Sequence, residues 1–116
     1  MGGSESRNAG EIEKEMNYIC LVTDEAAQDF THAQDWYEDR RIGLGSEFQQ
    51  ALDRKLAMLC HLPEMHPLYF ENKVRRGMLS DYPYSLYYTV SKNIVEIVAL
   101  LHDHLDIMPV LSKRVT

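Results

Sequence analysis

Residues 84–102 read YSLYYTVSKNIVEIVALLH, and this stretch decides the fold. Along 84–90 every second residue is apolar, which is the period of a β-strand with one buried face. The turn residues Ser91-Lys92-Asn93 follow, and residues 94–102 return as the most apolar run of the chain. The stretch therefore predicts a β-hairpin.

Two further strands are predicted upstream of this hairpin. Residues 74–79 alternate in the same way, after a connector that contains two prolines. Residues 17–22 form a short apolar run that is rich in β-formers, which is typical of a strand near the N-terminus.

Between these strands the apolar residues recur at steps of three and four, which predicts two amphipathic helices. The first covers residues 24–40 behind a Thr23 cap, and the second follows a capping box made by Ser46 and Gln49 and ends at Pro63. The short Gly43-Leu44-Gly45 segment is interpreted as the turn that makes the helices antiparallel neighbours.

This order of elements predicts an α+β fold. It consists of an N-terminal strand, an antiparallel helical hairpin packed on one face of a three- to four-stranded antiparallel sheet, and a short C-terminal segment. We expect one domain over residues 16–116, after a flexible leader at residues 1–15.

Alternation also assigns the two faces of the sheet. The side chains predicted to face the helices are Leu86, Tyr88, Val90, Val95, Ile97, Ala99 and Leu101. Those left on the open face are Ser85, Tyr87, Glu96, Val98, Leu100 and His102. Because that face is too apolar for solvent, either residues 106–116 or a partner should cover it.

The charge of the chain is unevenly distributed. The 116 residues have a net charge of −6, with −8 in residues 1–72 and +2 in residues 73–116. An acidic chain argues against sequence-blind nucleic-acid binding, which depends on many contacts between cations and phosphates. Any anion-binding surface must therefore lie in the C-terminal third.

The sequence gives little support for a cysteine-based site, a membrane span or a cofactor site. Cys20 and Cys60 lie 40 residues apart without a CxxC motif, so we expect two reduced, packed thiols in the cytoplasm. No apolar run approaches the roughly 20 residues of a membrane span. The common phosphate-binding and hydrolase motifs are missing, and no cofactor is expected.

Several motifs resemble the RelE/ParE toxin superfamily, and the resemblance covers residues 17–114. They are Trp36-Tyr37-Glu38 in the first helix, Gly43-Leu44-Gly45-x-x-Phe48, Val74-Arg75-Arg76, Tyr82-Pro83-Tyr84-Ser85-Leu86-Tyr87-Tyr88, and Ala99-Leu100-Leu101-His102 at the end of a strand. The chain is most similar to the ParE-like branch, whose members are often named plasmid stabilisation proteins. The resemblance implies a bacterial, growth-regulating toxin of a type II toxin–antitoxin pair, neutralised by an antitoxin encoded beside it.

The two branches of the superfamily act differently. ParE-like members bind DNA gyrase, whereas RelE-like members cut messenger RNA on the ribosome with a cluster of cations and a tyrosine. Ser85 and Leu105 stand where active ribonucleases of the family carry arginines. Each missing cation would remove roughly 2.7–4 kcal/mol of transition-state stabilisation. The sequence therefore favours a toxin that acts by protein binding and argues against an enzyme. A RelE-like endoribonuclease and a degenerate, non-toxic family member remain as alternatives.

The candidate site residues lie in the basic third. Weak catalytic candidates are Arg75, Arg76, Tyr87 and His102, beside Lys73. The expected partner-binding residues are Tyr87, Val98, Leu100 and His102. His102 and His104 could share a face, but without a third ligand they do not predict a metal site. Expected partners are the antitoxin and a gyrase or ribosome target, and the chain could form a homodimer or a toxin–antitoxin hetero-oligomer.

Overall fold

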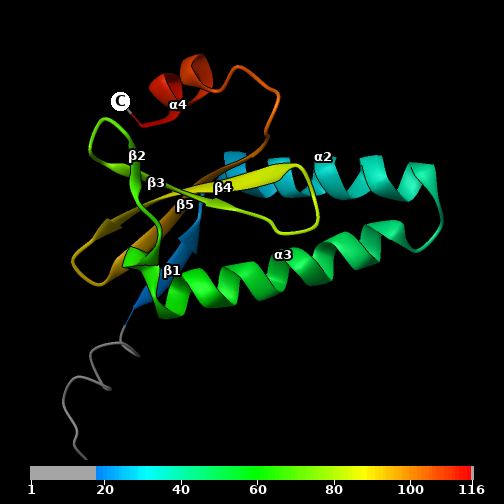
Figure 1. Ribbon diagram of the computed structural model, residues 1–116, viewed down its shortest axis with the longest axis horizontal. Helices are drawn as coiled ribbons and strands as arrows, with labels where there is room; N and C mark the ends of the chain where they lie inside the picture. Colours follow the sequence, from blue (N-terminus) through cyan, green and yellow to red (C-terminus); the bar gives the residue numbers. More distant parts are fainter. Residues whose placement is uncertain (1–17, 116) are drawn as a thin grey trace, which may run out of the picture.

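The computed structural model describes residues 18–115 and has the predicted α+β architecture (Figure 1). Its elements are β1 (Ile19–Val22), α2 (Asp24–Arg40), α3 (Leu44–His61), the 3-10 turn η1 (Pro63–Met65), β2 (Leu68–Phe70), β3 (Val74–Met78), β4 (Tyr84–Ser91), β5 (Ile94–His102) and α4 (Met108–Val115). Asn17 of the predicted first strand, the predicted leader at residues 1–15, and Thr116 lie outside the described residues.

The sheet is larger than predicted and is mixed rather than purely antiparallel. Within residues 18–115 it has five strands in the order β1-β5-β4-β3-β2, in which β1 runs parallel to β5 and the other neighbours are antiparallel. The additional strand, β2, has only three residues and pairs irregularly with β3, so it carries no clear alternation in the sequence.

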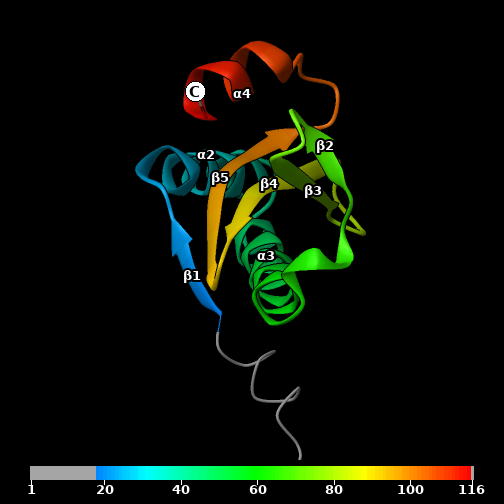
Figure 2. The same ribbon diagram turned by 90° about the vertical axis from the view of Figure 1, so that its left-hand side faces the viewer.

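Helices cover both faces of the sheet, as Figures 1 and 2 show. The hairpin of α2 and α3 packs on one face, and the inner core there contains Ala26, Phe48, Leu52, Leu59, Leu86, Tyr88, Val95, Ile97 and Leu100. On the other face α4 closes an outer core that contains Val74, Tyr87, Val98, Ala99, Leu101, Ile107 and Leu111. The sequence predicted that either residues 106–116 or a partner would cover the apolar face. In the structure the C-terminal segment, which contains α4, covers it.

A bulge in β5 decides which side chains face the helices. β5 has one residue more than β4 at Val98, and such an insertion moves every later side chain to the opposite face. The prediction that Ala99 and Leu101 face the helices is therefore wrong, since both lie in the outer core. Leu100, predicted on the open face, belongs to the inner core.

Tyr88 connects the inner core to η1. Its side chain is fully buried, and its hydroxyl donates a hydrogen bond of 2.6 Å to the carbonyl oxygen of Pro63. Burial, opposed in part by the charge of Arg75, raises the pKa of the Tyr88 phenol from 10.0 to about 12. The neutral phenol is thus the form that the folded state holds.

We expect the protein to lose stability at alkaline pH through Tyr88. Because the folded pKa is raised, the contribution of the group is fully present below pH 10 and is lost as the pH rises toward about 12. Urea unfolding measured between pH 8 and pH 12 should show this fall, and Tyr88→Phe should make the curve flatter. An equally steep fall in Tyr88→Phe would contradict the assignment.

The start of α3 is capped differently from the prediction. Thr23 caps α2 as expected, with its hydroxyl accepting from the amide of Ala26 at 3.1 Å. At α3, however, the helix begins at Leu44 behind Gly43, which has a φ of 92°, so Ser46 lies inside the first turn and does not cap it. The Glu38 carboxylate instead accepts from the amides of Gly43 and Gly45 at 3.0–3.2 Å. This places a negative charge at the positive end of α3.

Gly45 is required where α3 crosses α2. A Cβ atom on Gly45 would lie 2.9 Å from the Gln34 carbonyl oxygen and 2.9 Å from Glu38 Oε1. In an open helix Gly→Ala adds about 1 kcal/mol of stability. Here we expect Gly45→Ala to lower the free energy of unfolding by about 1–3 kcal/mol instead. Urea denaturation of Gly45→Ala beside Ser46→Ala, an exposed neighbour, tests this; an increase in stability for Gly45→Ala would contradict the close contact.

The two cysteines correct another prediction. Cys20 of β1 and Cys60 near the end of α3 form a disulfide with their Cα atoms 5.8 Å apart, so they are not two reduced thiols. A separation of 40 residues without a CxxC motif gives no sign of this pairing. It depends on β1 lying beside the end of α3, which is a tertiary arrangement.

Candidate functional site

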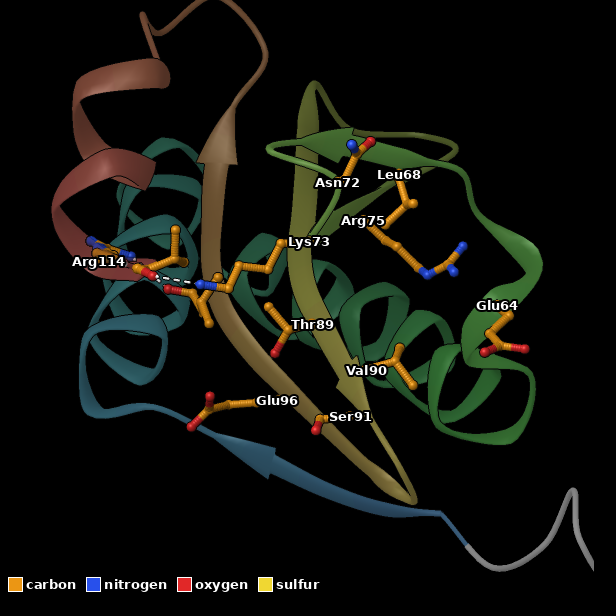
Figure 3. Close-up of a pocket in the computed structure, with 12 residues that line it drawn as sticks. Glu64, Leu68, Asn72, Lys73, Arg75, Thr89, Val90, Ser91, Glu96 and Arg114 are labelled. Carbon is orange, nitrogen blue, oxygen red and sulfur yellow. Dashed lines mark hydrogen bonds between the residues drawn. The ribbon is translucent and has the colours of Figure 1, made fainter.

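The basic third of the chain borders a groove on the face of the sheet that α4 covers (Figure 3). The outer groove, as we call it, has a volume of about 670 Å³. Thr89 of β4 and Glu96 of β5 contribute to its floor, and Arg114 of α4 lies at its rim. Lys73, directly before β3, and Arg75 of β3 point in opposite directions, Lys73 toward the end of α4 and Arg75 toward Glu64.

Both Lys73 and Arg75 have protein acceptors. The Lys73 ammonium donates to the carbonyl oxygen of Val115 at 3.1 Å, and the Arg75 guanidinium donates to the carbonyl oxygen of His66 at 2.5 Å. Lys73 thereby ties β3 to the last turn of α4, and Arg75 ties β3 to the connector before β2. Each cation thus contributes to packing between elements.

Arg114 is fixed by the most developed ion pair of the described residues. Its guanidinium donates to both carboxylate oxygens of Asp29 on α2, at 2.6 and 3.1 Å, and to the carbonyl oxygen of Val98 at 3.0 Å. The same carboxylate accepts from the Leu100 amide at 3.0 Å. The hydrogen bond to Asp29 raises the pKa of Arg114, so the guanidinium stays charged.

The position of this pair follows from the topology of the sheet. β1 ends at Val22, and the last backbone bond from that side runs from the Thr23 amide to the Ile97 carbonyl oxygen. Beyond that point β5 has no neighbouring strand on this side, and its bulge begins at Val98. Asp29 and Arg114 satisfy backbone groups that a longer β1 would have paired.

Arg76 belongs to a second polar network, on the same face of the sheet. Its guanidinium donates to Ser85 Oγ at 3.2 Å and lies 3.3 Å from Asp103 Oδ1. The Ser85 hydroxyl donates to the same Asp103 oxygen at 2.7 Å, and Ser85 is fully buried. Arg76 is therefore already neutralised by a carboxylate and bonded to a buried hydroxyl.

The register of β3 and β4 shows which arginine shares the face of Ser85. Arg76 pairs with Tyr87 and Met78 pairs with Ser85, whereas Arg75 pairs with Tyr88 of the inner core. The sequence left this choice open because register depends on pairing across the sheet. The buried Tyr87 has its pKa raised mainly by burial, with the charge of Arg76 acting in the opposite direction.

Three of the four predicted partner-binding residues are buried. Tyr87 and Val98 lie in the outer core, covered by α4, and Leu100 lies in the inner core because of the bulge. A partner can therefore reach Tyr87 or Val98 only if the outer core opens. His102 is partly exposed at the end of β5, where its ring lies against Tyr84 with centroids 5.2 Å apart.

The His102 and His104 pair is a local turn contact. His102 Nδ1 accepts from the backbone amide of His104 at 3.1 Å, and the ring centroids lie 5.2 Å apart. Within residues 18–115 no group of three or more His, Cys, Asp or Glu side chains could hold a metal ion. Leu105, which stands at the arginine position of the family motif, is about half exposed in the loop after β5.

The sequence reasoning missed Asp29, Asp103 and Arg114. One signal was available for Asp29: it follows Ala26 by three residues and therefore falls on the apolar stripe of α2, where a charge requires a partner. Nothing in the sequence identifies that partner, because Arg114 lies 85 residues further along the chain.

Comparison with known proteins identifies a family that the chain matches. Residues 21–106 match the family described as ParE toxin of type II toxin-antitoxin system, parDE. A chain of the solved structure described as "Chromosomal ParDE TA system from P. aeruginosa" is similar in fold, with a TM-score of 0.68 and 17% identity over 74% of this chain and 96% of that chain. No curated protein matches. Among the described residues, no helix is long and apolar enough to cross a membrane.

Proposed function

The chain belongs to the ParE toxin family of type II toxin–antitoxin systems, and we propose that it inhibits a cellular target by binding it as a protein partner. The proposed target is DNA gyrase, and the proposed regulator is an antitoxin encoded beside the toxin. Both come from the resemblance to the ParE-like branch.

One observation carries the proposal of binding without catalysis. Four cations of the basic third are each bonded to protein acceptors: Lys73 to Val115, Arg75 to His66, Arg76 to Ser85 and Asp103, and Arg114 to Asp29. Cleavage of RNA needs cations that are free to stabilise charge developing on the phosphorus centre, and an acid and base positioned at the reacting oxygens. These cations hold the fold together instead.

The remaining catalytic candidates support the same conclusion. Tyr87 is buried with a raised pKa, which opposes its use as a base. Asp103 adds a negative charge beside Arg76, where a phosphate would be repelled. His102 is partly exposed, and its Nδ1 is occupied by the His104 amide.

The test is induction of the chain alone in bacterial cells. We expect growth arrest with a change in DNA supercoiling and unchanged messenger half-lives, and we expect co-expression of the adjacent reading frame to restore growth. Ile42→Ala, at a 90% exposed position on the hairpin turn, serves as a control that leaves the fold intact. Rapid, site-specific messenger cleavage that Arg76→Ala abolishes would replace this proposal with the RelE-like one.

Placing the missing family arginine at Ser85 should not produce a ribonuclease. Ser85 is fully buried and bridges Arg76 to Asp103, so Ser85→Arg inserts a bulky second cation into a filled site. We expect Ser85→Arg to lower the urea midpoint substantially without messenger cleavage, because overpacking and an added buried charge both destabilise the protein. Leu105→Arg, at an exposed position, should leave the midpoint unchanged. A stable, RNA-cleaving Ser85→Arg variant would contradict the structural role of Ser85.

A further inference from the structure

The Cys20–Cys60 disulfide ties the edge of the sheet to the helical hairpin. Cys20 lies in β1 and Cys60 is the last residue but one of α3, and their Cα atoms are 5.8 Å apart. In Figures 1 and 2 β1 lies beside the C-terminal end of α3. The bond spans 40 residues of sequence, so the loop that it closes contains α2 and nearly all of α3.

Other contacts hold β1 weakly. The strand has four residues and lies at the edge of the described sheet, where β5 is its one neighbour. Ile19, Leu21 and Val22 are 43–51% exposed, and Cys20 is the side chain of β1 that packs against the inner core. Because short, exposed elements open at a low free energy, the disulfide contributes a large share of what keeps β1 in place.

The elements on either side of the bond are held without it. Leu59, next to Cys60, is fully buried in the inner core together with Phe48 and Leu52, so packing fixes the end of α3. β5 pairs with β4 from Ile94 to His102. Breaking the disulfide therefore loosens β1 and leaves α3 and the rest of the sheet in position.

A loosened β1 affects the start of α2. The Thr23 amide donates to the carbonyl oxygen of Ile97 at 3.0 Å, and the Thr23 hydroxyl caps α2 by accepting from the Ala26 amide. Thr23 directly follows β1, so motion of the strand reaches this cap. The disulfide thus controls the order of one edge of the molecule, from β1 to the first turn of α2.

The bond is placed where a reductant can reach it. Both cysteines are half-buried, so the bond lies near the surface. They are the two cysteines of the chain, so no other pairing within one molecule competes with this one. Disulfides that are not sealed inside a protein are the ones that respond to the thiol–disulfide balance around them.

We propose that the Cys20–Cys60 disulfide is a reversible redox latch on β1, which a dithiol opens. One thiolate of the dithiol attacks a sulfur of the bond and displaces the other cysteine as a thiolate, which takes up a proton. The second thiol of the reductant then releases the remaining cysteine from the mixed disulfide. The protein S–S bond breaks, the S–S bond of the oxidised reductant forms, and two electrons and two protons pass to Cys20 and Cys60.

The experiment compares the full chain by NMR before and after treatment with dithiothreitol, and again after reoxidation with oxidised glutathione. We expect the amide order parameters of Ile19–Val22 to fall from about 0.85 to below about 0.6 on reduction, while those of β3 and β4 stay near 0.85. Reoxidation should restore the first values. Alkylation followed by mass measurement should label no thiol before reduction and two thiols after it.

Urea unfolding provides a second readout. Reduction returns freedom to the unfolded chain, so the equilibrium constant for unfolding should rise about 30- to 1,000-fold. The double variant Cys20→Ser/Cys60→Ser is the matched control: its urea midpoint should be the same with and without dithiothreitol. The wild-type comparison needs no substitution, so it stands even if this variant folds poorly.

Three results would overturn the latch. The native chain could keep its disulfide in dithiothreitol until urea unfolds it, which would make the bond a permanent part of the scaffold. The order parameters of β1 could stay high after reduction while the midpoint falls, which would mean that the bond acts through the unfolded chain alone. Reduction could also lower the order parameters of β3 and β4 as much as those of β1, which would show a loss of the whole fold.

Discussion

Truncation of Tyr88 to alanine should lower the free energy of unfolding by about 3–5 kcal/mol, the range for large aromatic residues deleted from a core. The side chain is fully buried in the inner core, and its hydroxyl holds η1 to the sheet through Pro63. Tyr88→Ala removes both contributions and leaves a cavity. Since the free energy of unfolding of a small domain is about 5–15 kcal/mol in total, this single change should remove much of the stability.

Tyr88→Phe separates the two contributions. It keeps the packing and deletes the 2.6 Å hydrogen bond, so we expect a loss of about 1–2 kcal/mol. Urea unfolding measures both losses. Ile42→Ala is the control, because Ile42 is the most exposed large apolar residue of the described chain. Its free energy of unfolding should stay within about 0.5 kcal/mol of the wild-type value. Losses below about 1 kcal/mol for Tyr88→Ala would show that the inner core is assigned incorrectly.

Removal of the Asp29 carboxylate is expected to have the second largest effect, a loss of about 2–3 kcal/mol. Asp29→Ala leaves the Arg114 guanidinium with only the Val98 carbonyl oxygen as acceptor and deprives the Leu100 amide of its partner. Both side chains of the pair are at most 20% exposed, so water replaces these bonds poorly. Because Arg114 anchors α4, the variant should also expose the outer core.

A double-mutant cycle tests the pair directly. Asp29→Ala, Arg114→Ala and the double variant should give a coupling energy above about 1 kcal/mol in urea unfolding. The matched cycle uses Arg41 and Glu47, an ion pair at 3.4 Å whose side chains are 59% and 55% exposed, and should give about 0.2–1 kcal/mol. Hydrogen exchange in α4 should rise in Asp29→Ala. Equal coupling in the two cycles, with α4 still protected, would contradict the anchoring role.

Much of the fold could be predicted because its signals are local. The alternation in 84–90, the turn at Lys92 and Asn93, the Thr23 cap and the stripes of α2 and α3 each depend on neighbours a few residues away. The structure confirms all of these elements. The family resemblance, which the match over residues 21–106 confirms, drew on the same local motifs in their order.

The features that escaped prediction depend on contacts across the fold. One extra residue at Val98 reverses the faces of β5, and no local pattern announces a bulge in an almost wholly apolar strand. The disulfide, the parallel pairing of β1 and the bond between Asp29 and Arg114 join segments that are 40 to 85 residues apart. Glu38 replaced Ser46 as the cap of α3 because the turn brings its carboxylate back to the Gly43 and Gly45 amides.

The roles of the candidate site residues were even harder to predict from the sequence, because they too depend on contacts across the fold. The sequence correctly placed the cations in the C-terminal third, but their roles depend on acceptors such as Ser85, Asp103 and the carbonyl oxygens of His66 and Val115. Once these acceptors are known, the cations become part of the scaffold. The burial of Tyr87 and Val98 under α4 likewise could not be read from alternation alone.

The most direct test of inhibition by binding is a titration of purified DNA gyrase with the purified chain, with ribosome-bound messenger incubated in parallel. We expect that the supercoiling activity of gyrase falls in proportion to the added chain and reaches its plateau near one chain per binding site, while the messenger stays intact. Unaffected gyrase, together with cleavage of many messenger molecules per chain, would contradict it.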